Sequence, residues 1–229
     1  MKPDILEKIQ QETDGWPYLL ELPQELYGLT FGKLYREVGD TFELFSYTNE
    51  EKHLGVVAYY HQETKEYKLK IRRGLTEFCL MQFITASFAE YEKYLKQYLE
   101  SAVHDLAVYN PDTISYVTRA LNITQWDYRD ILPQELEGFE LFINPTQMVR
   151  VLNGSYIVFD YSDFSIESNF IIYYNEFRSE FFGEARIKNI PEMNYTFDSK
   201  NLEELEVKLK DHMLDRLREI RQRAVGTGV

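Results

Sequence analysis

The chain has 229 residues, of which 44% are hydrophobic and 15% aromatic, and its formal net charge is −13. This apolar content excludes an intrinsically disordered chain, and no run approaches the ~20 apolar residues that a membrane-spanning helix needs. Residues 1–108 carry 12 basic and 18 acidic side chains, and residues 109–229 carry 13 and 20. Neither half has the concentration of positive charge that nucleic-acid binding requires. With a single cysteine and no apolar leader after Met1, we expect a cytoplasmic protein that binds neither membrane nor nucleic acid.

The most informative feature of the sequence is an internal repeat. The segment from Trp16 to Gly28 returns 110 positions later, from Trp126 to Gly138, and both copies contain the run Leu-Pro-Gln-Glu-Leu. Further along the chain the offset is 114. The residues matched at this offset include Arg36 and Arg150, Phe45 and Phe159, Tyr47 and Tyr161, Tyr59-Tyr60 and Tyr173-Tyr174, Glu66 and Glu180, and Arg72 and Arg186. We therefore predict a tandem duplication, with one unit at 1–108 and the second at 109–229.

Each predicted unit begins with a short helix. Pro3-Asp4 and Pro111-Asp112 favour helices over 3–12 and 112–121, because proline suits the first helical turn and an acidic side chain suits its positive end. A turn-rich stretch with the tryptophan follows. The Leu-Pro-Gln-Glu-Leu run is then interpreted as one helical turn.

Alternation of period two predicts the strands that come next. It is clearest over 41–47 and 155–161, where aromatic residues recur at every second or third position. Asn153-Gly154, just before the second of these, is suited to a tight hairpin turn. The remaining predicted strands cover 55–61, 66–72, 170–175 and 180–187, and a further strand in each unit ends at Phe83 or Phe197. This predicts an antiparallel sheet of about four to five strands in each unit.

A long amphipathic helix is predicted at the end of each unit. Its apolar residues recur every three or four positions, at Phe88, Tyr91, Leu95, Leu99 and Val103 and at Leu202, Leu205, Leu209, Met213 and Leu217. Thr85 and Ser199 are the expected caps. We predict an α+β fold made of two-layer units, each with its short and long helices packed on one face of the sheet, and we expect a pseudo-twofold axis between the copies.

Two matched arginines are candidate binding residues. Arg36 and Arg150 fall in expected strands, where a guanidinium needs a partner if it is partly buried. One interpretation gives each a carboxylate of its own unit, with Glu66 and Glu180 as the candidates. The alternative is that both approach the pseudo-twofold axis and bind an anion.

Four matched tyrosines are candidate binding residues of another kind. Neighbours on a strand point to opposite faces, so one residue of Tyr59-Tyr60 and one of Tyr173-Tyr174 should point out of the sheet. An exposed row of tyrosines would suit a protein interface, because tyrosine combines apolar area with a polar tip. The alternative is that tyrosine is simply a good strand former.

Motifs for catalysis or metal binding are absent from the sequence. The four histidines lack the spacing of a metal motif, and the chain contains neither a glycine-rich phosphate loop nor a nucleophile elbow. We predict no catalytic residue, no metal site and no cofactor, and we expect that the protein is not an enzyme.

Two functional hypotheses follow from these observations. The first is a non-catalytic protein-binding module, such as an adaptor, a chaperone or an immunity-type inhibitor, whose acidic, tyrosine-rich surface binds a basic protein. The second is a protein that binds a small molecule or an anion in a groove between the two repeats.

Overall fold

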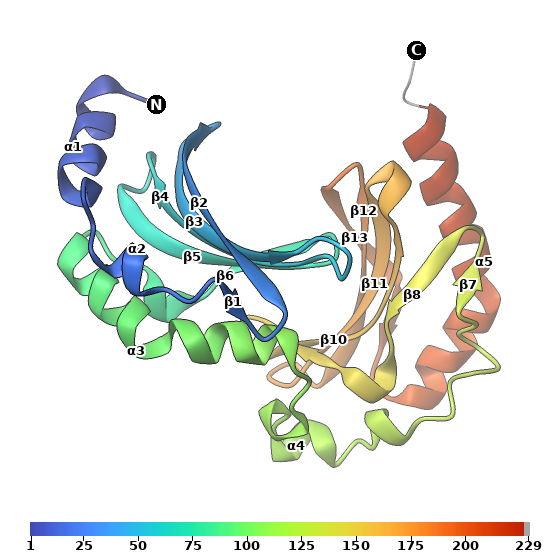
Figure 1. Ribbon diagram of the computed structural model, residues 1–229. Coiled ribbons are helices and arrows are strands. Elements are labelled where there is room, and N and C mark those ends of the chain that lie inside the picture. Colours follow the sequence, from blue (N-terminus) through green and yellow to red (C-terminus); the bar gives the residue numbers. More distant parts are fainter. Residues whose placement is uncertain (227–229) are drawn as a thin grey trace. The chain divides into compact units, whose positions relative to one another are not determined.

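The computed structural model describes residues 1–226 (Figure 1). The chain divides into two compact units, Met1–Tyr109 and Asn110–Val229. Within the described residues one sheet has six strands and the other has seven, and every strand pairing is antiparallel. Helices accompany both sheets, which confirms the α+β class.

The sheet of the first unit joins its strands in chain order, β1-β2-β3-β4-β5-β6. The elements of this unit are α1 (Pro3–Thr13), α2 (Tyr18–Glu21), β1 (Glu25–Leu26), β2 (Leu29–Val38), β3 (Thr41–Asn49), β4 (Leu54–His61), β5 (Glu66–Arg73), β6 (Thr76–Cys79), the 3-10 turn η1 (Met81–Phe83) and α3 (Phe88–Ala107). The sheet has six strands rather than the predicted four to five, because β1 and β2 precede the first predicted strand.

The sheet of the second unit has the order β13-β12-β11-β10-β8-β7, with β9 paired to β10. The elements are η2 (Pro111–Thr113), α4 (Tyr116–Arg119), η3 (Ile123–Gln125), β7 (Glu135–Leu136), β8 (Phe139–Ile143), η4 (Pro145–Gln147), β9 (Val149–Arg150), β10 (Ser155–Asp163), η5 (Phe164–Ile166), β11 (Ser168–Asn175), β12 (Glu180–Ile187), β13 (Ile190–Ser199) and α5 (Leu202–Gly226). The offset of the repeat rises from 110 to 114 between Gly138 and Arg150, so the second unit has four more residues here than the first unit. The 3-10 turn η4 lies in this stretch and separates β8 from β9, where the first unit has the single strand β2.

The Leu-Pro-Gln-Glu-Leu run was predicted to be one helical turn. In the structure it is instead the start of a tight hairpin. Its last two residues form β1 in one unit and β7 in the other. The two turn residues that follow have positive φ, at 50° and 80° for Tyr27 and Gly28 and at 52° and 79° for Glu137 and Gly138. Positive φ at both positions is the type I′ geometry that joins twisted strands. The prediction was wrong because the glycine, which tolerates this conformation, decides the local structure.

The predicted helix over 112–121 is also wrong. In its place the chain forms the 3-10 turn η2 and the four-residue helix α4. Ser115 interrupts the helix because its backbone is extended and its side chain accepts a hydrogen bond from the N–H of Thr118. A serine that caps a new turn in this way ends the preceding one.

The long helices have different caps from those predicted. Ser87, rather than Thr85, accepts the N–H of the residue three positions later at the start of α3. Asn201, rather than Ser199, does the same for α5 at 2.8 Å. Thr85 instead donates its hydroxyl to Glu90. Both caps lie two residues beyond the predicted ones, so the long helices of the two units are capped at matched positions.

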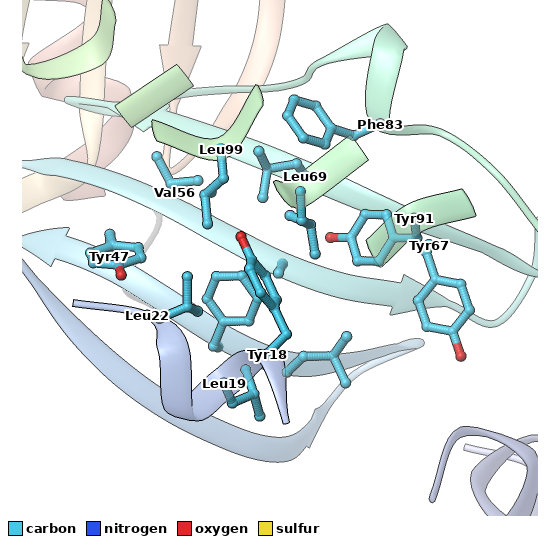
Figure 2. Close-up of a cluster of buried hydrophobic side chains, with 14 of the residues drawn as sticks. Tyr18, Leu19, Leu22, Tyr47, Val56, Tyr67, Leu69, Phe83, Tyr91 and Leu99 are labelled. Atoms are coloured by element: carbon cyan, nitrogen blue, oxygen red, sulfur yellow. The ribbon is translucent and has the colours of Figure 1, made fainter. Parts of the chain in front are cut away.

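The core of the first unit lies between α3 and the sheet (Figure 2). The helix contributes its apolar stripe, and Tyr91 also donates its hydroxyl to the carbonyl of Lys68 in β5 at 2.6 Å. From the sheet, Val56 and Leu69 face the same cluster. Each large apolar side chain buried in this way stabilises the fold by about 1.5–3 kcal/mol relative to exposure.

Two side-chain hydrogen bonds occur in both units at matched positions. The hydroxyl of Tyr47 donates to the carbonyl of Pro23 at 2.8 Å, and that of Tyr161 donates to the carbonyl of Pro133 at 2.6 Å. Burial raises the pKa of Tyr47 to about 12. The second hydrogen bond found in both units joins a tryptophan to the long helix. The indole N–H groups of Trp16 and Trp126 donate to Glu92 and Glu206, at 3.1 and 2.6 Å. These bonds attach the segment before each sheet to the strand and helix that form its core.

Candidate functional site

Arg36 is neutralised within its own unit. It lies in β2, and its Nε is 2.8 Å from Oε2 of Glu43 in β3, a carboxylate that is almost buried. The partner is a carboxylate of the same unit, but it is not Glu66, which pairs with Lys68 at 3.1 Å. The reason is register, because Arg36 and Glu43 lie opposite each other in the β2–β3 ladder whereas Glu66 lies in β5.

Arg150 has a different environment. It lies in the two-residue strand β9 and is exposed. Among residues 1–226 no carboxylate is within ion-pair distance of it. The expected partner, Glu180, instead pairs with Arg178 and with Lys200 at 2.8 Å, which lowers the pKa of its carboxyl group. The two matched arginines therefore do not form equivalent sites.

The four candidate tyrosines are all buried, so the predicted exposed row is wrong. None of Tyr59, Tyr60, Tyr173 and Tyr174 is more than 7% exposed. Tyr60 belongs to the core cluster beside α3, whereas the hydroxyl of Tyr59, on the opposite face of the strand, lies 3.0 Å from Sγ of Cys79. Burial raises the pKa of Tyr59 and of Tyr173. Other tyrosines are exposed instead, namely Tyr27, Tyr98, Tyr116 and Tyr195.

The two groups of basic residues in the sequence do not form free positive patches. Near the end of β5, Lys68, Lys70 and Arg72 pair with Glu66, Glu77 and Glu50, and Arg73 donates to the carbonyl of Leu106. Along α5, Arg216 and Arg223 pair with Glu192 and Glu219, Arg218 with Glu137 and Asp215, and Arg221 with Asp163. Cations paired in this way leave little uncompensated positive charge for phosphates.

A buried polar cluster lies on the sheet of the second unit, on the face opposite Phe159 and Tyr161. Its centre is Asp160 in β10, which is fully buried. Oδ1 of Asp160 accepts from Ser162 at 3.0 Å and from Nδ2 of Asn169 at 3.1 Å. Oδ2 of Asp160 and Oδ1 of Asn169 are buried and have no hydrogen-bond partner among residues 1–226. Burial raises the pKa of Asp160 to about 7, so that the side chain takes up a proton near neutral pH.

Two charged residues of β12 stand next to this cluster. Nε of Arg186 is 2.7 Å from Oε1 of Glu184, and Arg186 lies opposite Asn169 in the β11–β12 ladder. Arg186 lowers the pKa of Asp160 and Glu184 raises it, both by less than burial does. The sequence analysis missed this cluster, although an aspartate inside a strand of aromatic and β-branched residues was a visible signal.

A second polar cluster lies where two hairpins of the first unit end. Asp40 in the β2–β3 turn, His61 at the end of β4 and Glu63 in the β4–β5 turn bring their ligand atoms within 4.8 Å of one another. Nε2 of His61 is 3.1 Å from Oδ2 of Asp40, and Nδ1 is 3.1 Å from Oγ1 of Thr64. The histidine spacing in the sequence did not indicate this cluster, because it depends on which hairpin ends are neighbours.

The edge strand β13 presents an open, partly apolar surface. In the described part of the chain it pairs only with β12. Three of its large apolar side chains are exposed, Ile190 by 70%, Met193 by 44% and Tyr195 by 74%. The corresponding strand of the first unit, β6, has only four residues and is followed by η1, whereas β13 has ten.

Comparison with protein-family models finds no match to this chain, and comparisons with curated proteins and with solved structures find none either. None of the helices within residues 1–226 combines the length and the apolar composition needed to cross a lipid bilayer.

Proposed function

We propose that this protein is a non-catalytic protein-binding module that uses the free edge of β13 to add an extended segment of its partner to the second sheet. The observation that carries the proposal is the combination of an unpaired ten-residue edge with exposed Ile190, Met193 and Tyr195. An exposed, apolar edge strand is a template for another strand, and soluble proteins usually keep such edges short or charged. Backbone hydrogen bonds would then supply affinity, and the side chains would supply selectivity.

The expected partner segment is basic. The second unit carries 13 basic and 20 acidic side chains, and four of its basic residues are arginines of α5 that are already ion-paired. A basic segment would be attracted by this net charge, which also speeds association at low ionic strength. The interface we propose differs from the predicted one, because the matched tyrosines are buried and Tyr195 takes their place.

The edge itself shows how uncontrolled pairing is limited. Pro191, the second residue of β13, cannot donate a backbone hydrogen bond. The β12–β13 register also shifts between Phe181 and Gly183, which twists the strand. Both devices are typical of edges that must avoid aggregation. We propose that they limit pairing along β13 to one specific partner strand.

The anion-binding alternative has less support. Arg36 is held by Glu43, so its charge is compensated, and Arg150 stands in a different local structure. The predicted cytoplasmic location stays a prediction.

We further propose that the two units, over 1–108 and 109–229, are tandem copies of one ancestral unit with a sheet and a long helix packed on one face. The matched Tyr–Pro, Trp–Glu and cap hydrogen bonds support this proposal, as do the I′ turns that occur at the same place in both units. In this view β13 is the copy of β6 that has become long enough to bind.

The proposed function can be tested with a short basic peptide of alternating lysine and valine, in the full-length protein. Fluorescence anisotropy should show binding, and replacing Ile190 and Tyr195 by serine should weaken it at least about tenfold, because central aromatic and apolar contacts dominate an interface. The same peptide with its alternate backbone amides N-methylated should not bind, since it cannot form a ladder.

A matched control separates edge binding from general attraction to an acidic protein. Leu20 on α2 of the first unit is 90% exposed, more than Ile190 or Tyr195, so Leu20→Ser removes an exposed apolar side chain elsewhere. This variant should bind the peptide as the wild type does. Equal binding by the N-methylated peptide, or an equal loss in the Leu20 variant, would contradict the proposal.

A further inference from the structure

We propose that Asp40, His61 and Glu63 bind a divalent transition metal of the zinc class at one end of the first sheet. The three side chains offer one imidazole nitrogen and two carboxylate oxygens, which is a ligand set that zinc accepts. Three protein ligands would leave one tetrahedral position for water or for a group of a partner protein. This site is independent of the β13 edge.

The distances suit a single ion. Zinc binds nitrogen and oxygen at about 2.0–2.2 Å, so two ligand atoms on one tetrahedral zinc lie about 3.4 Å apart. Nε2 of His61 and Oδ2 of Asp40 are 3.1 Å apart, and Glu63 brings its carboxylate to within 4.8 Å of both. Glu63 is exposed in a turn, so rotation of its side chain can close the remaining distance.

The backbone holds the two hairpin ends together without a metal. The N–H of Gln62 donates to the carbonyl of Asp40 at 2.9 Å, and His61 lies opposite Thr41 in the β3–β4 ladder. His61 is also held through its Nδ1, which accepts the backbone N–H of Thr64 at 3.3 Å and lies 3.1 Å from the hydroxyl of Thr64. A ligating histidine usually donates its second ring N–H to an acceptor, and the hydroxyl of Thr64 is placed to be that acceptor.

The charge around the site favours a cation. Within residues 1–226, no lysine or arginine is within ion-pair distance of Asp40 or Glu63, whereas nearby Glu66 is paired with Lys68. In the metal-free protein, Nε2 of His61 can donate its proton to Asp40. A metal at Nε2 requires that the imidazole proton be on Nδ1, where the hydroxyl of Thr64 can accept it in place of the hydrogen bond that Nδ1 accepts from the backbone N–H of Thr64 in the metal-free protein.

The second unit provides an internal comparison. At an offset of 114, the positions of the three ligands are occupied by Gly154, Asn175 and Phe177, none of which can bind zinc in this way. Asn175 instead donates Nδ2 to the carbonyl of Asn153, which stabilises the hairpin directly. The histidine is therefore not needed to form the hairpin, and asparagine is a suitable substitute for it.

A calorimetric titration of the full-length protein with Zn²⁺ near pH 7.5 tests the proposal. We expect one ion per chain, and His61→Asn should weaken binding at least about tenfold, with a similar loss in Asp40→Asn. Co²⁺ should give the intense visible absorption of a tetrahedral site in the wild type and not in the His61 variant. Circular dichroism should show that both variants remain folded.

His104→Asn is the matched control, because Nδ1 of His104 also lies near a carboxylate, 3.3 Å from Asp105, but without a third ligand. This variant should bind Zn²⁺ as the wild type does. The proposal is overturned if the His61 variant retains wild-type affinity, if the His104 variant loses as much, or if the wild type does not bind.

Discussion

The stability of the protein is expected to fall by about 4 kcal/mol between pH 4 and pH 7 through Asp160 alone. Its pKa is raised from 3.8 to about 7, so the folded state holds a proton over a range where the unfolded chain has lost it. This contribution is fully present below pH 4, decreases as the pH rises, and is lost above pH 7. Urea unfolding of the wild type and of Asp160→Asn at a series of pH values measures it as the difference between the two.

Asp160→Asn should be more stable than the wild type at pH 8. The amide carries no charge to desolvate, and it supplies N–H donors where Oδ2 has no partner and where Oδ1 of Asn169 can accept. Asp163, in the same strand, is the matched control because it is also buried but is ion-paired with Arg221. Asp163→Asn should be less stable than the wild type at pH 8. If Asp160→Asn is also less stable than the wild type at pH 8, the claim that the ionised Asp160 carboxylate destabilises the folded protein is wrong.

Truncation of a core phenylalanine should have the second large effect, and it should be confined to one unit. Phe45→Ala and Phe159→Ala remove matched side chains that are both fully buried, so each should cost about 3–5 kcal/mol. Hydrogen exchange should accelerate within residues 1–109 in the first variant and within 110–226 in the second. Phe177→Ala, at an exposed position, should change the stability by less than about 0.5 kcal/mol. Loss of protection throughout the chain in either variant would contradict two units with separate cores.

Strands and long helices could be predicted because their signals are local and repeated. Alternation correctly placed the strands that became β3 and β10, and Asn153 and Gly154 both have positive φ at the predicted turn. Of the residues in the predicted helical stripes, all are buried except Phe88 and Leu202 at the first turns, which are half-buried, and the stripes stop short of the buried residues Leu106, Ile220 and Ala224. Burial on one face every three or four residues is a strong signal over a long helix.

Short elements could not be predicted so well, because single residues decide them. The turn glycines convert the Leu-Pro-Gln-Glu-Leu runs into hairpins, and Ser115 ends the expected helix over 112–121. In both cases a weak helical signal competes with a residue that needs a special backbone or cap. Helix propensity alone does not tell which of the two will determine the local structure.

Side-chain exposure was the main failure for the candidate site. The side chains of Tyr59 and Tyr60 point to opposite faces of β4, as expected, yet both are buried. A side chain on the sheet face that points away from the helix can therefore still be shielded from water. Similarly, the partner of Arg36 depends on the β2–β3 register, and the Asp40–His61–Glu63 cluster depends on two hairpin ends. Such contacts between strands are set by pairing, which one sequence does not reveal.

The most direct test of the proposed function is hydrogen exchange of the full-length protein with and without the lysine–valine peptide. We expect slower exchange of the β13 amides, over Ile190–Ser199, when the peptide binds, because its backbone would pair with theirs. The shorter edge strand β6, over Thr76–Cys79, should exchange at an unchanged rate. Bound peptide without added protection in β13, or with protection only elsewhere, would show that this edge is not the binding site.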